Sequence, residues 1–281
     1  MKGTAERPPL PEDPAALPAV GVAFEAAVAA VAEALAIELS VGRRAALEAH
    51  VRLLLAWNAQ LNLTALRTPG RIAVGHVGDS LTAVPLLRRL APGAVDLLDL
   101  GSGGGFPGLA LAVTLPARRA ALVDSVGKKA RFLTIAGRTV QDVLNASGEP
   151  VPEISVHGVR AEVLGHEASQ RGAWDVVTGR AVGSLAELAE LALPLLRPGG
   201  HLLAWKQEHP GSQAFSAELA AAGPLIAAAG GGRPIVERAV PDPCPDILGE
   251  LRDHRLVVVG KLRATPRHFP RSPTERRRLL G

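Results

Sequence analysis

The chain has 281 residues, of which 47% are hydrophobic and 21% charged, a balance that supports a large buried core. No apolar run is both long enough and free enough of proline and glycine to span a bilayer, which takes roughly 20 residues. The single cysteine, Cys244, excludes an internal disulfide and argues against a cysteine-based zinc site, so we expect no metal.

The formal net charge of +4 is unevenly distributed along the chain. From Lys261 to the end there are seven Lys or Arg residues and one acid, Glu275, so this end carries +6 and the remainder about −2. A basic tail suits a polyanion such as RNA, because its side chains can contact phosphates and release counterions. A solvated tail without a partner explains the same charge equally well.

The first 92 residues divide into a leader and a helical part. Residues 1–20 contain five prolines and no signal-peptide pattern, so we expect a disordered leader on a cytoplasmic protein. Residues 21–92 are expected to form an N-terminal helical extension, in which Ser40 caps the longest helix. The expected helices cover residues 22–38, 42–63, a short stretch from Pro69, and 77–90.

From residue 93 the pattern changes to short β-rich runs that alternate with helical ones. The expected strands are 95–100, 119–124, 153–158, 174–179, 200–205 and 255–261, and the expected helices are 107–116, 126–141, 160–169, 184–196 and 210–222. Strands separated by helices of this length indicate a mainly parallel sheet, and residues 223–240 lead into a closing antiparallel pair. We therefore predict an α/β domain over residues 93–264, followed by a basic tail, residues 265–281.

A glycine-rich loop follows the first expected strand, at the edge of the sheet where ligands of open parallel sheets bind. Gly101, Gly103, Gly104 and Gly105 lie within five residues, and glycine lets a backbone approach a ligand closely. Phe106 occupies the place of the third glycine of a dinucleotide motif, and no Gly-Lys-Ser/Thr follows for a phosphate loop. A tight turn with a purely structural role remains an alternative.

Asp124 ends the second expected strand, 23 residues after Gly101. An acidic side chain at about this distance accepts hydrogen bonds from ribose hydroxyls, although capping of the next helix is its alternative role. The glycine loop and the acid together favour a ligand that contains a nucleoside.

Further polar residues follow the next three strands. The loop with Ala161 and Glu162 is placed to meet an adenine edge, although Glu162 could equally be a first-turn helix carboxylate. Arg180 follows the fourth strand, where its guanidinium could hold a cofactor carboxylate or a substrate phosphate, or simply lie on the surface. Lys206 ends the fifth strand on the same side. His76 and Asp79 are interpreted as packing and capping groups.

Several stretches resemble the family of small-subunit ribosomal RNA guanine-N7 methyltransferases called RsmG, formerly glucose-inhibited division protein B. The resemblance runs from about residue 45 to 262. It is carried by 57-WNAQLNLTALRTPGRIAVGHVGDSL-81, 97-LLDLGSGGGFPG-108, 122-LVDSVGKKARFL-133, 159-VRAEVL-164 and 177-VTGRAVGSLAEL-188. It implies a class I S-adenosylmethionine-dependent methyltransferase, with a Rossmann-like, mostly parallel seven-stranded sheet and an N-terminal helical extension.

The same resemblance implies roles for particular residues. Gly101 and Phe106 match the cofactor loop of the family, Ala161 and Glu162 match its adenine-side contacts, and Arg180 matches its arginine after the fourth strand. The expected binding residues for S-adenosylmethionine are therefore Gly101, Gly103, Gly105, Phe106, Asp124, Ala161, Glu162 and Arg180. For RNA we expect contacts from Lys128, Lys129, Arg131 and Lys206, with a solvated helix face as the alternative for the first three.

The sequence departs from the family pattern at three positions. Gly75 stands where the family usually has arginine, Gly78 where it has a hydrophobic residue, and Gln207 where it has glycine. These departures concern RNA contacts and helix stability more than the cofactor.

The reaction implied is methylation of N7 of a specific guanine in 16S ribosomal RNA. This nitrogen carries a lone pair and no proton, so no general base is expected and Arg180 would act by positioning. The expected partner is 16S ribosomal RNA or the small ribosomal subunit, with no membrane, and the protein is expected to be a monomer. Alternatives are a methyltransferase of the same fold that acts on another RNA or a small molecule, a nicotinamide-dependent oxidoreductase, and a non-catalytic RNA-binding module.

Overall fold

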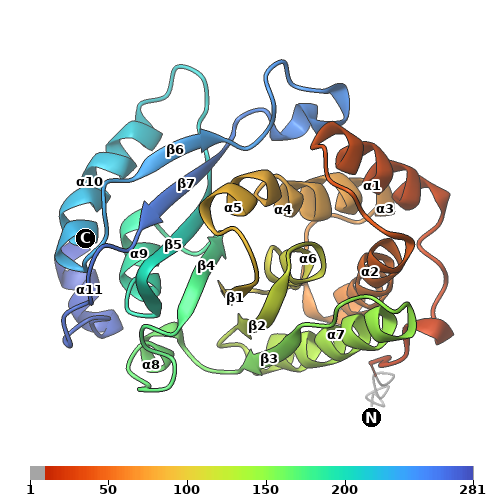
Figure 1. The fold of residues 1–281 in the computed structure, drawn as a ribbon, viewed down its shortest axis with the longest axis horizontal. Coiled ribbons are helices and arrows are strands. Elements are labelled where there is room, and N and C mark those ends of the chain that lie inside the picture. Colours follow the sequence, from red (N-terminus) through yellow and green to blue (C-terminus); the bar gives the residue numbers. More distant parts are fainter. Residues whose placement is uncertain (1–9, 281) are drawn as a thin grey trace, which may run out of the picture.

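A seven-stranded sheet forms the centre of the computed structural model, which describes residues 10–280 (Figure 1). The strands are β1 (Val95–Leu100), β2 (Ala117–Val123), β3 (Glu153–His157), β4 (Trp174–Arg180), β5 (Leu196–Gln207), β6 (Ile235–Arg238) and β7 (His254–Gly260). Their spatial order is β3-β2-β1-β4-β5-β7-β6, with β7 antiparallel to both neighbours and the first five strands parallel. The predicted parallel sheet and its closing antiparallel pair are confirmed.

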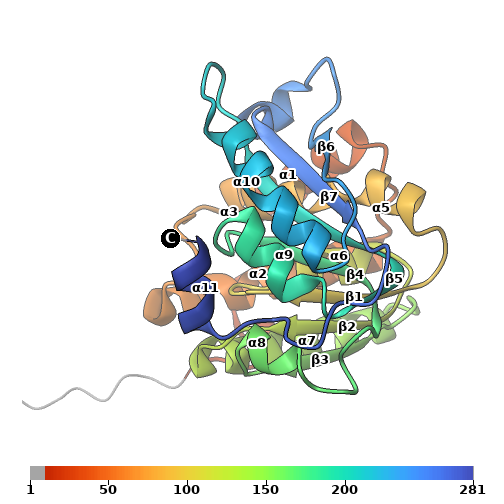
Figure 2. The same ribbon diagram turned by 90° about the vertical axis from the view of Figure 1, so that its left-hand side faces the viewer.

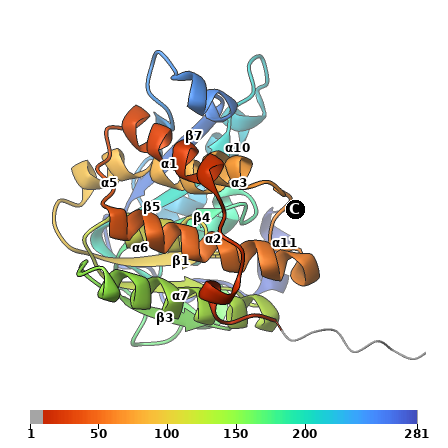
Figure 3. The same ribbon diagram turned by 90° about the vertical axis from the view of Figure 1, so that its right-hand side faces the viewer.

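Helices cover both faces of this sheet (Figures 2 and 3). They are α1 (Val22–Ala34), α2 (Val41–Leu61), α3 (Pro69–Ile72), α4 (Asp79–Leu81), α5 (Val84–Leu90), α6 (Gly108–Thr114), α7 (Gly127–Ala146), α8 (Ala161–Leu164), α9 (Leu185–Ala192), α10 (Ala214–Ala228) and α11 (Pro273–Leu280). Three short elements complete the chain: the 3-10 turns η1 (Pro14–Ala16) and η3 (Asp246–Leu251), and the π-helical turn η2 (Ala73–Gly78). Within residues 10–280, none of these helices combines the length and the apolar character that crossing a membrane needs.

Two hydrophobic clusters, one on each face, hold these layers together. The first joins α1, α2, α6 and α7 to one face of the sheet, and the second joins α8, α9 and α10 to the other. Strands between two apolar layers are buried on both sides, which explains the near-continuous apolar runs in the sequence. The carboxyl ends of the parallel strands therefore emerge at one edge of the sheet, where the loops can hold a ligand.

Helix α2 begins as expected from the sequence. The side chain of Ser40 accepts a hydrogen bond from the backbone N–H of Arg43, so the predicted N-cap is confirmed. Leu47, Val51 and Leu54, which recur at helical spacing, are fully buried. Burial of each such side chain stabilises the fold by about 2 kcal/mol and fixes α2 against α7 and the sheet.

Several expected helices have other bounds in the structure: α1 ends at Ala34 instead of residue 38, and α10 covers Ala214–Ala228 instead of 210–222. Two further differences have a local cause. Residues 77–90 are not one helix, because the chain passes from η2 through α4 to α5, and Pro85 lies in the first turn of α5. Helix α8 ends at Leu164 instead of residue 169. There the carbonyl of Gly165 accepts a hydrogen bond from Arg171 at 2.8 Å, and this contact stabilises a turn where the helix was expected to continue.

The end of the expected leader lies against the helical part, whereas its residues 1–9 lie outside the described residues. The indole of Trp57 donates a hydrogen bond to the carbonyl of Pro11 at 2.6 Å, and Arg131 pairs with Glu12 at 2.9 Å. The backbone N–H of Val20 donates to Glu48. Residues 10–20 thus have polar partners on α2 and α7.

The expected basic tail also packs on the domain. Arg171 donates hydrogen bonds to the carbonyls of Thr265, Pro266 and Phe269. Further along the chain, Arg271 forms an ion pair with the fully buried carboxylate of Glu190 on α9, with hydrogen bonds from Nε and Nη2 at 2.8 and 2.6 Å. These contacts lead the chain back across the sheet edge, so that α11 lies beside α8 and α9 (Figure 2).

Candidate functional site

The glycine loop after β1 turns sharply because Gly101, Gly103 and Gly105 adopt positive φ angles that favour glycine. Gly101 has φ +67°, and a Cβ atom there would lie 2.6 Å from the side chain of Val182. Gly105 has φ +89°, and a Cβ there would lie 2.7 Å from the ring of His50. The loop therefore passes between the β4 loop and α2 with no room for side chains at these positions.

Asp99, at the end of β1, stabilises the glycine loop through hydrogen bonds of its side chain. Its buried carboxylate accepts hydrogen bonds from the backbone N–H of Gly108 at 3.1 Å and from the hydroxyl of Thr178 at 2.7 Å. Burial raises the pKa of Asp99 to about 6, even though these hydrogen bonds act in the opposite direction. Asp99 thus ties β1, β4 and the start of α6 together.

Asp124 lies beside this loop, at the end of β2. One carboxylate oxygen accepts a hydrogen bond from the backbone N–H of Gly103 at 3.1 Å, and the other accepts one from Val126 at 2.9 Å, at the start of α7. The alternatives of ligand contact and helix capping are therefore compatible, because each carboxylate oxygen has a second lone pair that can accept a ribose hydroxyl.

A cavity of about 410 Å³ opens beside the loop at the carboxyl ends of the strands. It brings together four of the expected cofactor residues, which are Gly101, Asp124, Ala161 and Glu162. Arg276 of α11 also lines this cavity. Its guanidinium forms an ion pair with Glu162, and only 11% and 13% of these two side chains are exposed.

Phe106 lies elsewhere. Its ring stacks between His50 and His76, with ring centroids 4.6 and 5.1 Å away. His50 donates a hydrogen bond from Nε2 to the carbonyl of Gly104 at 2.8 Å, while its Nδ1 is buried without a partner. Burial lowers the pKa of His50 to about 4, so the ring is neutral. Among the expected cofactor residues, Gly105 and Phe106 thus pack against α2 and are not among the residues that line the 410 Å³ cavity.

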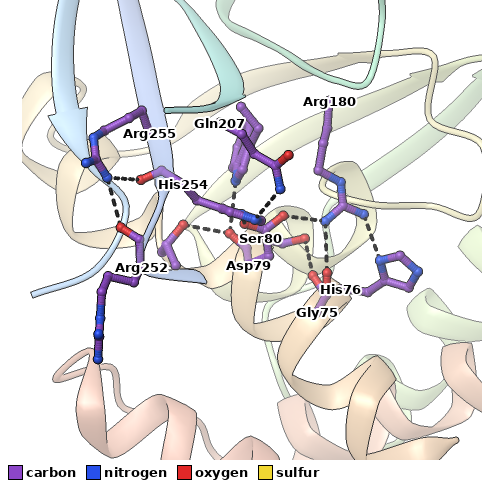
Figure 4. A network of polar contacts seen from close by, with 11 residues as sticks. Gly75, His76, Asp79, Ser80, Arg180, Gln207, Arg252, His254 and Arg255 are labelled. Atoms are coloured by element: carbon purple, nitrogen blue, oxygen red, sulfur yellow. Dashed lines mark hydrogen bonds and ion pairs between the residues drawn. The ribbon is translucent and has the colours of Figure 1, made fainter. Parts of the chain in front are cut away.

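Arg180, at the end of β4, is held by the helical extension. It donates hydrogen bonds to the carboxylate of Asp79 at 2.7 Å, to Nδ1 of His76 at 3.1 Å and to the carbonyl of Gly75 at 3.5 Å. Figure 4 shows the guanidinium between Asp79 and His76. The surface alternative for Arg180 is wrong, since only 17% of its side chain is exposed.

Asp79 is the centre of this network. Its second carboxylate oxygen accepts a hydrogen bond from Nδ1 of His254 at 2.8 Å, and its carbonyl accepts one from the indole of Trp205 at 3.0 Å. Burial alone raises the pKa of Asp79, but the hydrogen bond from His254 and the charge of Arg180 outweigh it and hold the pKa below its ordinary value. Asp79 is therefore a buried anion that joins α4 to β4, β5 and β7.

A second cavity, of about 350 Å³, is lined by four members of this network and by three neighbouring residues: Asp79, Arg180, Trp205 and His254, with Ala181, Lys206 and Gln207. Ala181 borders both cavities, so the two spaces lie on either side of the residue that follows β4. Sequence reasoning missed Asp79, His76 and His254 as members of a site. The i,i+3 spacing of His76 and Asp79 was the only local signal, and nothing in the sequence linked His254 to them.

The expected RNA contacts differ in their accessibility. Lys128 is exposed and Lys129 half-buried near the start of α7, while Arg131 is exposed and pairs with Glu12. Lys206 does not lie free on the surface, because it pairs with Glu218 at 2.7 Å and donates to the carbonyl of Gly183.

The three departures from the family pattern have local explanations. A Cβ at Gly78 would lie 3.2 Å from the side chain of Val31 on α1, so a larger residue there would require Val31 to shift. Gln207 donates a hydrogen bond to Nε2 of His254 at 3.0 Å and orients that ring toward Asp79. A Cβ at Gly75 would lie 2.8 Å from the side chain of Leu66, and the carbonyl of Gly75 accepts a hydrogen bond from Arg180.

No group of three His, Cys, Asp or Glu side chains among residues 10–280 is arranged to hold a metal ion. The cavity beside the glycine loop has instead the parts that a nucleoside ligand needs: the backbone of Gly101, the carboxyl group of Asp124 and the half-buried ion pair of Glu162 with Arg276. With the strand order β3-β2-β1-β4-β5-β7-β6, these features define a class I S-adenosylmethionine-dependent methyltransferase.

Comparisons with known proteins give the family. The family model for rRNA small subunit methyltransferase G, called GidB, matches residues 43–222. Proteins called ribosomal RNA small subunit methyltransferase G are similar to this chain. The one from Chloroflexus aggregans is 36% identical over 84% of this chain and 89% of its own. The one from Leptothrix cholodnii is 41% identical over 64% of this chain and 76% of its own. The chain belongs to the GidB family.

Among solved structures, a branched-chain polyamine synthase C9 mutein from Thermus thermophilus is similar, with a TM-score of 0.49 and 18% identity. The similarity covers 79% of this chain and 65% of that chain. A similarity this distant bears on neither substrate nor mechanism.

Proposed function

We propose that this protein transfers the methyl group of S-adenosylmethionine to N7 of a guanine in 16S ribosomal RNA. The observation that carries the proposal is the pair of cavities that meet at Ala181, in a chain of the GidB family. One cavity has the groups for an adenosine, and the other has a fixed guanidinium and an indole for a base.

In the cofactor cavity, Gly101 provides a close backbone, Asp124 accepts hydrogen bonds from the ribose, and Ala161 and Glu162 meet the adenine edge. The fit rests on the lining of this cavity, which brings Gly101, Asp124 and Glu162 together, and on the lone pairs that Asp124 keeps beyond its two backbone contacts. When bound, S-adenosylmethionine supplies an activated methyl group on a sulfonium.

In the second cavity, Arg180 is the group we propose to position the target guanine. The hydrogen bonds of Arg180 to Asp79 and His76 fix the plane of its guanidinium. A donor fixed in this way positions a base more accurately than a mobile one. His76 is neutral at pH 7, because burial lowers its pKa to about 4 and the charge of Arg180 acts in the same direction.

The transfer forms a bond between N7 and the methyl carbon and breaks the bond between that carbon and sulfur. The sulfur keeps the electron pair, and N7 gives its lone pair to the new bond. Because N7 carries no proton, the chain needs no general base, and alignment can supply roughly 7–11 kcal/mol of the reduction in barrier. A site of fixed donors without a catalytic dyad is sufficient for this reaction.

For RNA, we propose that Lys128, Lys129 and Arg131 at the start of α7 meet phosphates. The exposure of Lys128 and Arg131 supports this role, whereas the ion pair of Lys206 with Glu218 makes that residue a wall of the second cavity instead. We further propose a monomeric protein that acts in the cytoplasm on the small ribosomal subunit. The elution volume and light scattering of the purified chain test its oligomeric state.

The experiment that tests the function maps N7-methylguanine in small-subunit RNA by chemical strand scission. We expect one cleavage site in RNA from cells with the gene, and its loss in cells without it. Unmodified small subunits that gain the same site on incubation with purified enzyme and S-adenosylmethionine would give the activity directly. An unchanged cleavage pattern between the two strains would reject the proposal.

A further inference from the structure

The C-terminal helix α11 brings a side chain into the cofactor cavity. The segment before α11 is held in place by Arg271. The guanidinium of Arg271 binds the buried carboxylate of Glu190, and the backbone N–H of Arg271 donates a hydrogen bond to the same carboxylate at 2.8 Å. Arg276 follows on α11 and pairs with Glu162, 114 residues away in the sequence. The basic tail therefore forms one wall of the cavity next to the glycine loop.

The guanidinium of Arg276 is not fully satisfied in this position. Its Nη2 is bound to Glu162, but its Nη1 is buried without a hydrogen-bond partner. A buried donor without an acceptor costs about 1–3 kcal/mol or more, so a chain rarely keeps one unless something else supplies the acceptor. Because Arg276 lines the cavity, a ligand bound there can supply it.

The edge of adenine has the complementary pattern. It presents an exocyclic amino group, which donates, next to ring nitrogens, which accept. Glu162 can only accept when ionised, and Arg276 can only donate, so the two side chains together match one donor and one acceptor of the base. A guanidinium is also planar and can keep its contact with Glu162 while it donates to the ligand.

We propose that Arg276 is a cofactor-binding residue, which donates a hydrogen bond from Nη1 to a ring nitrogen of the adenine of S-adenosylmethionine. This inference rests on the proposed function, since it concerns the same cavity. It makes the tail a structural part of the cofactor site.

The test measures cofactor affinity by calorimetry for the full-length chain and two variants. Arg276→Ala removes the proposed donor. Arg278→Ala is the matched control, because it removes the same charge from the same helix at an exposed position. The ligands are S-adenosylmethionine and 5′-methylthioadenosine, which share the adenosine part. Thermal unfolding of each variant establishes that it is folded.

We expect Arg276→Ala to weaken binding of both ligands by about tenfold or more, since a hydrogen bond to a charged group is lost. Arg278→Ala should bind both as the wild type does. Equal loss for the two ligands places the contact on the adenosine half, whereas loss for S-adenosylmethionine alone would overturn the inference.

Two other results would also overturn it. Unchanged affinity in Arg276→Ala would mean that α11 only lies beside the cavity, and tighter binding would mean that Arg276 obstructs the ligand. Neither result would touch the proposed function, which would instead fail if the wild type bound no S-adenosylmethionine.

Discussion

Asp79 accepts a hydrogen bond from Arg180 at 2.7 Å, and this ion pair joins the helical extension to the carboxyl end of β4. The two residues are 101 positions apart in the sequence. The extension is therefore part of the site, because the side chain that we propose to position guanine is held by a residue outside the sheet.

Loss of the Asp79 carboxylate should destabilise the fold strongly. Only 2% of its side chain is exposed, and its removal leaves the Arg180 guanidinium without its anionic partner and Nδ1 of His254 without its acceptor. We expect Asp79→Ala to lower the free energy of unfolding by about 3–5 kcal/mol, measured by urea denaturation. Asp142→Ala is the control, since Asp142 forms an exposed pair with Arg138 and its loss should cost under about 0.5 kcal/mol. Similar losses in the two variants would refute a structural role for the buried pair.

Replacement of Arg180 by lysine should impair catalysis more than stability. Lysine keeps the charge, but a single ammonium cannot hold Asp79 and His76 in the geometry of a planar fork. We expect kcat/KM for methyl transfer to small subunits to fall by about tenfold or more, since a fixed guide becomes mobile. Activity within twofold of the wild type, in a variant with unchanged Tm, would show that the fork is not needed.

Gly101 should be intolerant of a side chain because of what it contacts, not only because of its backbone angles. Its φ of +67° is the same as that of Gly148, but only Gly101 has a neighbour, Val182, within 2.6 Å of an added Cβ. We expect Gly101→Ala to weaken binding of S-adenosylmethionine by about tenfold or more, because the β4 loop must shift. Gly148→Ala shares the backbone strain and lies in open space, so it should lose some stability and keep its affinity. Equal affinities in the two variants would contradict the proposed role of the loop.

The buried neutral ring of His50 should make stability depend on pH. Its pKa is lowered from 6.5 to about 4 in the folded chain, so between these values only the unfolded chain binds the proton. The stabilisation is therefore complete above pH 6.5 and is lost as the pH falls toward 4. Between pH 7 and pH 5, we expect the wild type to lose about 2 kcal/mol more than His50→Gln, in urea titrations at both values. Gln keeps a donor for Gly104 without the titration. An identical loss in both proteins would assign the pH dependence to other groups.

The parts of the fold that were predicted from the sequence are those with local causes. The N-cap at Ser40 acts within one turn, and the alternation of apolar strands with helices predicted that β1 to β5 are parallel. The positions of Gly101 and Asp124 followed from the strand ends, because a parallel sheet brings its carboxyl ends together. The end of α8 was not predictable in this way, since it depends on Arg171 and the tail.

Side chains that meet across the fold were decided only by the tertiary structure. His254 reaches Asp79 across 175 residues, and Arg276 reaches Glu162 across 114, contacts for which neither sequence spacing nor periodicity gives a signal. Phe106 was placed in the right loop, yet its ring packs between His50 and His76 because the backbone turn at Gly105 directs the loop toward α2. The sequence by itself thus determined the class of sheet and the edge where we propose that a nucleoside binds, since both depend on local pattern. The partners of the charged side chains were decided by the packing of the extension and the tail, because a charge that is buried without an opposite charge costs much free energy.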